Sequence, residues 1–211
     1  MIKKQNKFGM SCLKDYKDAL YSCLVQLKPK ACLEIGTHIG GTTEVFETYF
    51  REHCPDGYLV TGDVKTYNKL ESKNVKQVIV KSHIPFEELI KHHSDLDPKE
   101  TQYSENSRYI NELIYWAALR KAKSIDTFDF IFIDGNHTKE SFEKDLQLSL
   151  NLLSDDGYIL IDDVPSNLEC SEYFYEKIKP SKKFKIYEFE DWSSPVGAVL
   201  LKPAEIPELS E

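Results

Sequence analysis

Short apolar runs alternate with segments of helical periodicity along most of this chain. The runs predict strands over 31–35, 58–63, 75–81, 128–134, 158–162, 184–189 and 198–201. Between them, apolar residues three or four positions apart predict helices over 11–28, 42–54, 67–73, 138–153 and 168–179. Thr138 is the candidate N-cap of the fourth helix, and a turn at 155–157 is predicted to end it. This order of elements is typical of an α/β fold with a mostly parallel sheet and helices on both faces.

The last two strands follow a different rule. Only residues 190–197 join them, and that length is too short for a helical crossover, so we expect an antiparallel β-hairpin. The prediction is therefore a Rossmann-like, doubly wound, seven-stranded sheet that ends in this hairpin. We expect residues 1–211 to form a single domain, with flexible ends at 1–10 and 204–211.

Residues 84–125 are longer than one crossover helix requires. Helices are predicted over 85–92 and 109–123, around a polar stretch at 93–108 without periodicity. A polar segment of this length inside a domain is usually functional or disordered. We interpret the region as an insertion or lid, with a plain flexible loop as the alternative.

Composition narrows the class of protein. The 211 residues are 41% hydrophobic, enough for the core of one large domain. A net charge of -8 argues against nucleic acid and membrane as partners, although the lysine-rich stretch 177–185 is locally basic. Five scattered cysteines indicate reduced thiols, and the chain has no apolar stretch of signal-peptide or membrane-spanning length, so we expect a cytoplasmic protein.

The first candidate site is the turn after the strand at 31–35. Glycines lack Cβ, so a ligand can approach the backbone closely there, and the amides that open the next helix can face a polar or anionic group. In open α/β sheets ligands bind at this end of the strands. The residues expected to contact a ligand are Glu34, Gly36, Thr37, His38, Gly40, Gly41 and Thr42.

Asp63 ends the next strand along the chain. A carboxylate there can accept hydrogen bonds from both ribose hydroxyls of a nucleoside, and the alternative is a helix cap or turn former. The glycine spacing is G-x-x-x-G-G rather than the G-x-G-x-x-G of nicotinamide binders. An NAD-dependent oxidoreductase therefore remains only an alternative, beside a non-catalytic binding protein that retains the fold.

Two motifs resemble those of known enzymes. The first, Glu34-x-Gly36-x-x-x-Gly40, resembles the opening motif of class I S-adenosylmethionine-dependent methyltransferases. The second, FIFIDGNH at 130–137 with YILIDD at 158–163, resembles the methyltransferase-24 group and the macrocin-type sugar O-methyltransferases, and more distantly the catechol and caffeoyl-CoA types. This resemblance implies an S-adenosyl-L-methionine-dependent O-methyltransferase that acts on a hydroxyl of a small molecule, with a sugar as one candidate.

The resemblance also implies roles for single residues. Asp134, Asp162 and Asp163 match the positions that hold a metal in metal-dependent members, and three carboxylates suit Mg²⁺. Such an ion could lower the pKa of the acceptor hydroxyl. The alternative is that the pair at 162–163 binds no ion. Asp134 is also expected beside the cofactor, and Ser82 lies where this fold usually places the adenine.

At the position expected for the general base, this sequence differs from the sugar-methylating relatives. Asn136 stands where sugar-methylating relatives often have Asp, and an amide cannot take up a proton. His137 is then the candidate base, together with Asp134 in the catalytic set, and Lys139 is a weaker candidate. The alternative for His137 is a helix-start residue bonded to backbone. The amphipathic helix that begins at Ser11 could cover the ligand site or a second copy of the chain, so a homodimer is among the expected partners.

Overall fold

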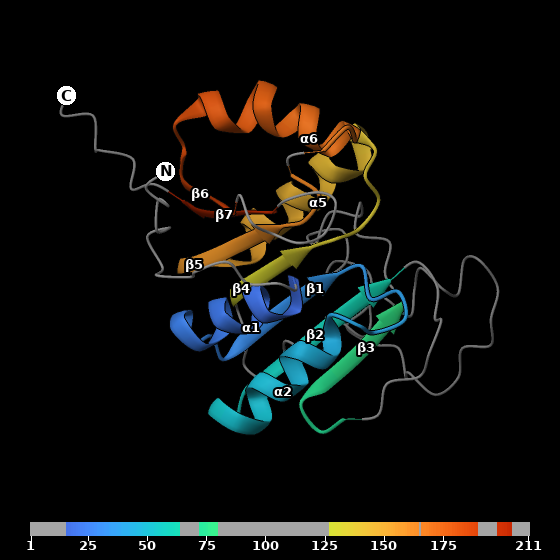
Figure 1. Ribbon diagram of the computed structural model, residues 1–211, viewed down its shortest axis with the longest axis vertical. Coiled ribbons are helices and arrows are strands. Elements are labelled where there is room, and N and C mark those ends of the chain that lie inside the picture. The colour runs from blue at the N-terminus through green and yellow to red at the C-terminus, as the bar shows by residue number, and fades with distance from the viewer. Residues whose placement is uncertain (1–15, 64–71, 80–126, 165, 190–197, 204–211) are drawn as a thin grey trace, which may run out of the picture.

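The computed structural model describes residues 16–63, 72–79, 127–164, 166–189 and 198–203. Seven strands form one sheet in the order β3-β2-β1-β4-β5-β7-β6 (Figure 1). Their bounds are β1 Ala31–Ile35, β2 Tyr58–Asp63, β3 Val75–Ile79, β4 Phe128–Ile133, β5 Leu153–Ile161, β6 Phe184–Phe189 and β7 Ala198–Pro203. The first five are parallel and β7 is antiparallel to β6, as the sequence predicts. The structure adds that β7 lies between β6 and β5 and is antiparallel to β5 as well.

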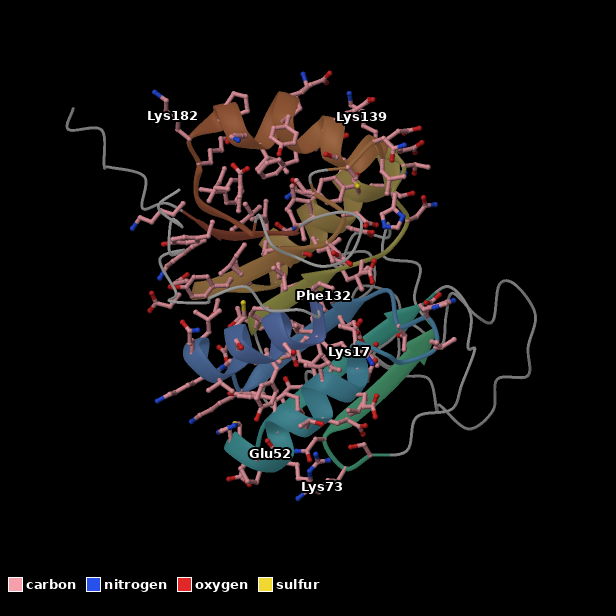
Figure 2. All side chains as sticks on the ribbon, in the orientation of Figure 1. Lys17, Glu52, Lys73, Phe132, Lys139 and Lys182 are labelled. Atoms are coloured by element: carbon pink, nitrogen blue, oxygen red, sulfur yellow. The ribbon has the colours of Figure 1, made fainter. Side chains whose placement is uncertain are left out.

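Helices cover both faces because side chains of a strand point alternately to either side. Cys32 of β1 packs with α1 (Tyr16–Leu27) and α2 (Thr43–His53), whereas Leu33 packs with α5 (Lys139–Leu152) and α6 (Glu169–Tyr173). Phe132 lies fully buried in the first of these two cores, near the centre of Figure 2, whereas Lys182 lies at the periphery. The sheet is therefore packed between two apolar layers, and this packing fixes the positions of its strand ends.

The junction of α5 and β5 differs from the prediction. Thr138 caps α5 as expected, since its side chain accepts the backbone N–H of Ser141. The predicted turn at 155–157, however, belongs to β5, which begins at Leu153 directly after the helix. An irregularity in the pairing of β4 with β5 takes up the extra residues and leaves Asp155 and Asp156 exposed.

The helical segment predicted over 168–179 has three parts. After α6, a π-helix η1 (Phe174–Ile178) and a 3-10 helix η2 (Lys179–Ser181) continue it. The wider π turn keeps both Phe174 and Ile178 buried against the sheet. Within the described ranges, no helix has the length and apolar content that crossing a membrane requires. The predictions for 1–10, 67–71, 80–125 and 204–211 lie outside the described residues.

Candidate functional site

The carboxyl ends of four parallel strands meet at one edge of the sheet. Backbone hydrogen bonds just beyond the strands hold this edge together. They run from Gly36 N–H to the Gly62 carbonyl (2.8 Å), from Asp134 N–H to Ile35 (2.8 Å) and from Asp162 N–H to Ile133 (3.1 Å). The segments that follow β1, β2, β4 and β5 are therefore neighbours, as the sequence reasoning required.

The glycine turn after β1 allows this close approach. Gly36 has a φ of +103°, and a Cβ built there would lie 1.9 Å from the backbone oxygen of Asp134. Only glycine can occupy such a position without moving the neighbouring strand. Gly40 also has a positive φ, of +87°, and its N–H donates to the carbonyl of Thr37. The turn then leads through Gly41 and Thr42 into α2.

Asp63 lies against this turn, at the end of β2. Its Oδ2 accepts the backbone N–H of His38 at 2.7 Å, and His38 has a φ of +45°. The carboxylate expected to meet a ribose is thus held beside the predicted cofactor turn by the turn's own backbone. A carboxylate has several acceptor positions, so the bond to His38 does not prevent it from binding ligand hydroxyls.

Glu34 is buried beneath the same turn, with no exposed surface. Its Oε2 accepts hydrogen bonds from the hydroxyls of Thr43 (2.6 Å) and Thr61 (2.5 Å), and Thr61 in turn contacts the hydroxyl of Thr37 at 2.6 Å. The other oxygen, Oε1, is buried without a hydrogen-bond partner among the described residues. Burial raises the pKa of Glu34 to about 8, against the effect of the two hydroxyl donors.

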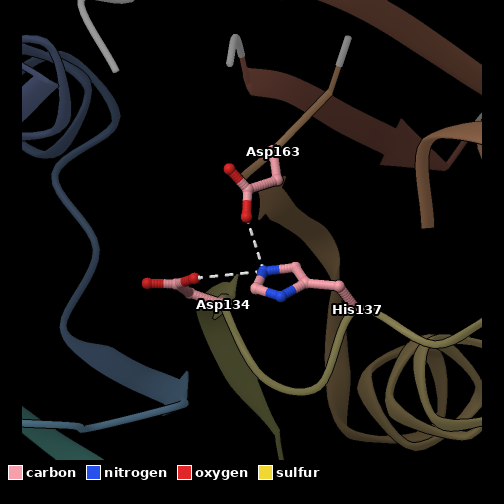
Figure 3. Close-up of side chains that lie close together, drawn as sticks. All are labelled: Asp134, His137 and Asp163. Carbon is pink, nitrogen blue, oxygen red and sulfur yellow. Dashed lines mark ion pairs between the residues drawn. The ribbon is translucent and has the colours of Figure 1, made fainter. Parts of the chain in front are cut away.

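The second group of functional side chains contains Asp134, His137 and Asp163 (Figure 3). One ligand atom from each lies within 4.8 Å of those of the others. Nε2 of His137 is 2.5 Å from Asp163 Oδ2 and 3.8 Å from Asp134 Oδ1. The shorter contact is an ion pair rather than a well-aligned hydrogen bond. Asp163 has a φ of +60°, a strained conformation of the kind that collects at functional sites.

The charges of this group explain its pKa values. Contact with Asp134, and then with Asp163, raises the pKa of His137 to about 10, although partial burial opposes the shift. Burial raises the pKa of Asp134, and the His137 contact works in the other direction. His137 therefore carries a proton at neutral pH and acts as the counter-ion of two carboxylates. Because two carboxylates share this one positive charge, the group can still attract a cation.

Other predicted site residues are not part of this group of three. Asp162 is not among the three residues that the structure brings together, and Asp163 and His137 are instead joined directly. Asn136 accepts the N–H of Thr138 at 3.0 Å and thus shapes the turn before α5. Lys139 pairs with Glu176 at 3.2 Å. Ser82 and the region 84–125 lie outside the described residues.

Sequence reasoning missed the two hydroxyls that bind Glu34. Thr61 lies in the middle of β2, where a buried hydroxyl reads as an ordinary strand residue, and Thr43 reads as the first residue of a helix. A signal was available for Thr61, because a polar side chain on a strand predicted to be buried on both faces needs a partner. Pairing across parallel strands supplies it: Thr61 lies opposite Glu34.

Comparisons with known proteins agree with this geometry. The chain resembles PaMTH1, a Podospora anserina methyltransferase solved with SAH (15% identity, 90% of this chain and 78% of that chain, TM-score 0.54). It also resembles TomG, a Streptomyces achromogenes O-methyltransferase of tomaymycin synthesis solved with SAM (15% identity, 90% of this chain and 79% of that chain, TM-score 0.54). A third similar structure is MycE, a methyltransferase of the mycinamycin pathway solved with Mg, SAH and mycinamycin VI (13% identity, 86% of this chain and 46% of that chain, TM-score 0.54). At these identities the likeness shows a shared fold.

Among curated proteins no sequence matches significantly. A family model, by contrast, matches residues 33–164, well over half of the chain and the whole span from the glycine turn to Asp163. The model is described as a methyltransferase domain. The chain therefore belongs to the methyltransferase-24 family of methyltransferase domains.

Proposed function

We propose that this protein is an S-adenosylmethionine-dependent O-methyltransferase that methylates a hydroxyl of a small molecule, with a divalent cation bound beside the cofactor. One observation carries the proposal: the glycine turn, with Asp63 and Glu34 around it, lies directly against the strand end that bears Asp134. A nucleoside site and an acidic, cation-attracting site therefore share one edge of the sheet.

The residues around the turn fit S-adenosylmethionine. Asp63 offers acceptors for the ribose hydroxyls, and the glycines at 36 and 40 let the ligand approach the backbone. Glu34 offers the buried Oε1 to a donor on the ligand, and the amino-acid part of the cofactor carries an ammonium donor. When bound, the cofactor supplies an electrophilic methyl group on a sulfonium. The solved neighbours include complexes with SAM and SAH.

The acidic group fits a divalent cation. Asp134 and Asp163 supply carboxylate oxygens, which Mg²⁺ prefers, and the ion would replace His137 as their positive partner. Asp162, next in the chain to Asp163, is the third oxygen ligand that we propose. A cation held there would polarise the acceptor hydroxyl. MycE, to which the chain is similar, was solved with Mg, SAH and mycinamycin VI. A sugar hydroxyl is one of the acceptors that we propose.

His137 is the residue that we propose to take up the proton of the acceptor hydroxyl. With a pKa of about 10 it is already protonated at neutral pH, and it must first lose that proton. The two carboxylates cause the raised pKa, so His137 can act as a base when they are neutralised by a cation instead. Without the ion, Asp134 and Asp163 hold the ring through the contacts that Figure 3 shows.

Calorimetry with S-adenosylmethionine tests the cofactor proposal. We expect micromolar to sub-millimolar binding that Asp63→Ala weakens at least tenfold, because the ribose loses its acceptor. Asp156→Ala is the matched control, since that acid is exposed and pairs with Lys202 away from the strand ends. Absence of binding at millimolar cofactor would refute the proposal, and binding of NADH instead would support the oxidoreductase alternative. A gain of about 14 Da in a panel of hydroxylated compounds would identify the transfer.

The metal proposal has a separate test. Electron paramagnetic resonance of added Mn²⁺ should show one bound ion per chain, displaced by Mg²⁺ and lost in Asp163→Asn, whereas Asp156→Asn should keep it. Methyl transfer that is unchanged by EDTA and by Asp163→Asn would remove the ion from the mechanism and leave the cofactor site intact.

A further inference from the structure

The carboxyl group of Glu34 is held in one orientation. Both described donors, the hydroxyls of Thr43 and Thr61, go to the same oxygen, Oε2, at 2.6 and 2.5 Å. Oε1 is buried and receives no hydrogen bond from the described residues. The described part of the chain thus saturates one carboxyl oxygen and leaves the other for a group from outside the described residues.

The hydroxyl protons can be assigned by counting. A threonine hydroxyl has one proton, and Thr61 donates its proton to Glu34. In the 2.6 Å contact between Thr61 and Thr37, Thr37 must therefore be the donor. The chain of bonds runs from the glycine turn, through Thr61 of β2, to the carboxyl. Since Oε2 accepts twice, the proton of the neutral acid sits on Oε1.

The surroundings favour this neutral form. The pKa of Glu34 is raised to about 8, mainly by burial and to a smaller extent by the charges of Asp134 and Asp63. These acids face Glu34 from the ends of β4 and β2, and Thr43 faces it from α2 with an uncharged hydroxyl. Only a cation that enters from the ligand side would reverse the balance, because an adjacent positive charge stabilises a carboxylate.

We propose that Glu34 is protonated in the free protein and releases its proton when the ammonium group of the cofactor binds beside Oε1, with Thr61 as the positioning residue that fixes the carboxyl. This inference rests on the proposed function. The O–H bond at Oε1 breaks, the proton passes to the buffer, and the carboxylate that remains faces the ammonium. The step needs no other reactant. It also selects for ligands that carry the amino-acid part.

The experiment is calorimetry with S-adenosylhomocysteine at pH 6.5 in two buffers of different ionisation enthalpy. At that pH a free α-amino group is already protonated, so a released proton must come from the protein. We expect about one proton released per ligand bound. The control ligand is 5′-methylthioadenosine, which has the nucleoside but no amino-acid part. It should bind with no proton release.

Two variants complete the test. Glu34→Gln should bind S-adenosylhomocysteine without proton release. Thr61→Val removes one donor to the carboxylate and should weaken S-adenosylhomocysteine about tenfold, as loss of a hydrogen bond to a charged group predicts, but leave 5′-methylthioadenosine unchanged. Thr61→Ser should restore wild-type binding of both ligands. A merely structural role of Thr61 would weaken both ligands together.

The outcomes separate this proposal from the proposed function. Binding of S-adenosylhomocysteine to the wild type without proton exchange, or equal release by Glu34→Gln, would overturn the proton linkage and leave methyl transfer standing. Equal weakening of both ligands in Thr61→Val would overturn the positioning role. If neither ligand binds to the wild-type protein, the proposed function itself fails.

Discussion

Replacement of Gly36 by alanine should force the ends of β1 and β4 apart. The new Cβ would lie 1.9 Å from the carbonyl oxygen of Asp134, 2.5 Å from its carbonyl carbon and 3.1 Å from the nitrogen of Gly135. All three are backbone atoms, so no side-chain rotation can relieve the clash. The φ of +103° is itself unfavourable for alanine.

The size of the effect follows from these contacts. A non-glycine residue at a positive φ costs about 1–2 kcal/mol. To restore an ordinary contact distance the strand ends must separate by more than 1 Å, which breaks the 2.8 Å bond from Asp134 N–H to Ile35 and costs about 1 kcal/mol more. We expect a loss of about 2–3 kcal/mol, a large part of the roughly 5–15 kcal/mol of a typical domain.

Urea denaturation measures this loss directly. The midpoint should fall with little change in the slope, and cofactor binding should weaken, since Asp134 moves with the strand end. Gly157→Ala is the comparison: its φ is ordinary, but its Cβ would lie 2.7 Å from Leu153 Cδ1, 2.8 Å from Cγ and 3.0 Å from the backbone oxygen of Ser154, so overpacking should cost about 1–3 kcal/mol and leave cofactor binding unchanged. A Gly36→Ala protein as stable as the wild type, with intact cofactor binding, would refute the claim that this glycine sets the strand spacing.

Three further predictions concern single side chains. Because the folded-state pKa of Glu34 is raised to about 8, its contribution to stability is complete below its ordinary pKa of 4.5 and is lost as the pH rises through 8. Relative to Glu34→Gln, the free energy of unfolding of the wild type should fall by up to about 1.4 kcal/mol per pH unit in between, and parallel curves would contradict this. Asp163→Asn should lower the pKa of His137, which Asp134 and Asp163 raise, and an unchanged NMR titration of the ring would contradict it. Thr138→Ala should destabilise the protein by about 0.5–1 kcal/mol in thermal melts through loss of the α5 cap, and Thr138→Ser should not.

Periodicity was enough to predict the architecture because it reports which side of each element meets the core. The seven strands, the antiparallel hairpin and the Thr138 cap all follow from local patterns. The error at the α5–β5 junction has a local cause as well. Asp155-Asp156-Gly157 is a common turn sequence, but burial of Leu153 beside β4 draws the chain into the sheet before these residues. Tertiary packing sets where β5 begins, and the sequence pattern alone carries no information about this packing.

The candidate site, like the fold, could be predicted from the sequence only in part. Motifs could indicate that Asp134 and Asp163 lie near one another, because the carboxyl ends of parallel strands share one edge, whatever the side chains are. They could not show which groups touch. The contact of His137 with Asp163 joins residues 26 positions apart through a φ of +60°, and the bond from Thr61 to Glu34 depends on strand register. In both places a side chain meets a partner that belongs to, or follows, another strand. The charge at each place therefore depends on how the strands assemble at this edge. This is why Glu34 and His137 are both protonated near neutrality although they lie in the same acidic region: burial dominates for the carboxyl, and contact with two carboxylates dominates for the imidazole.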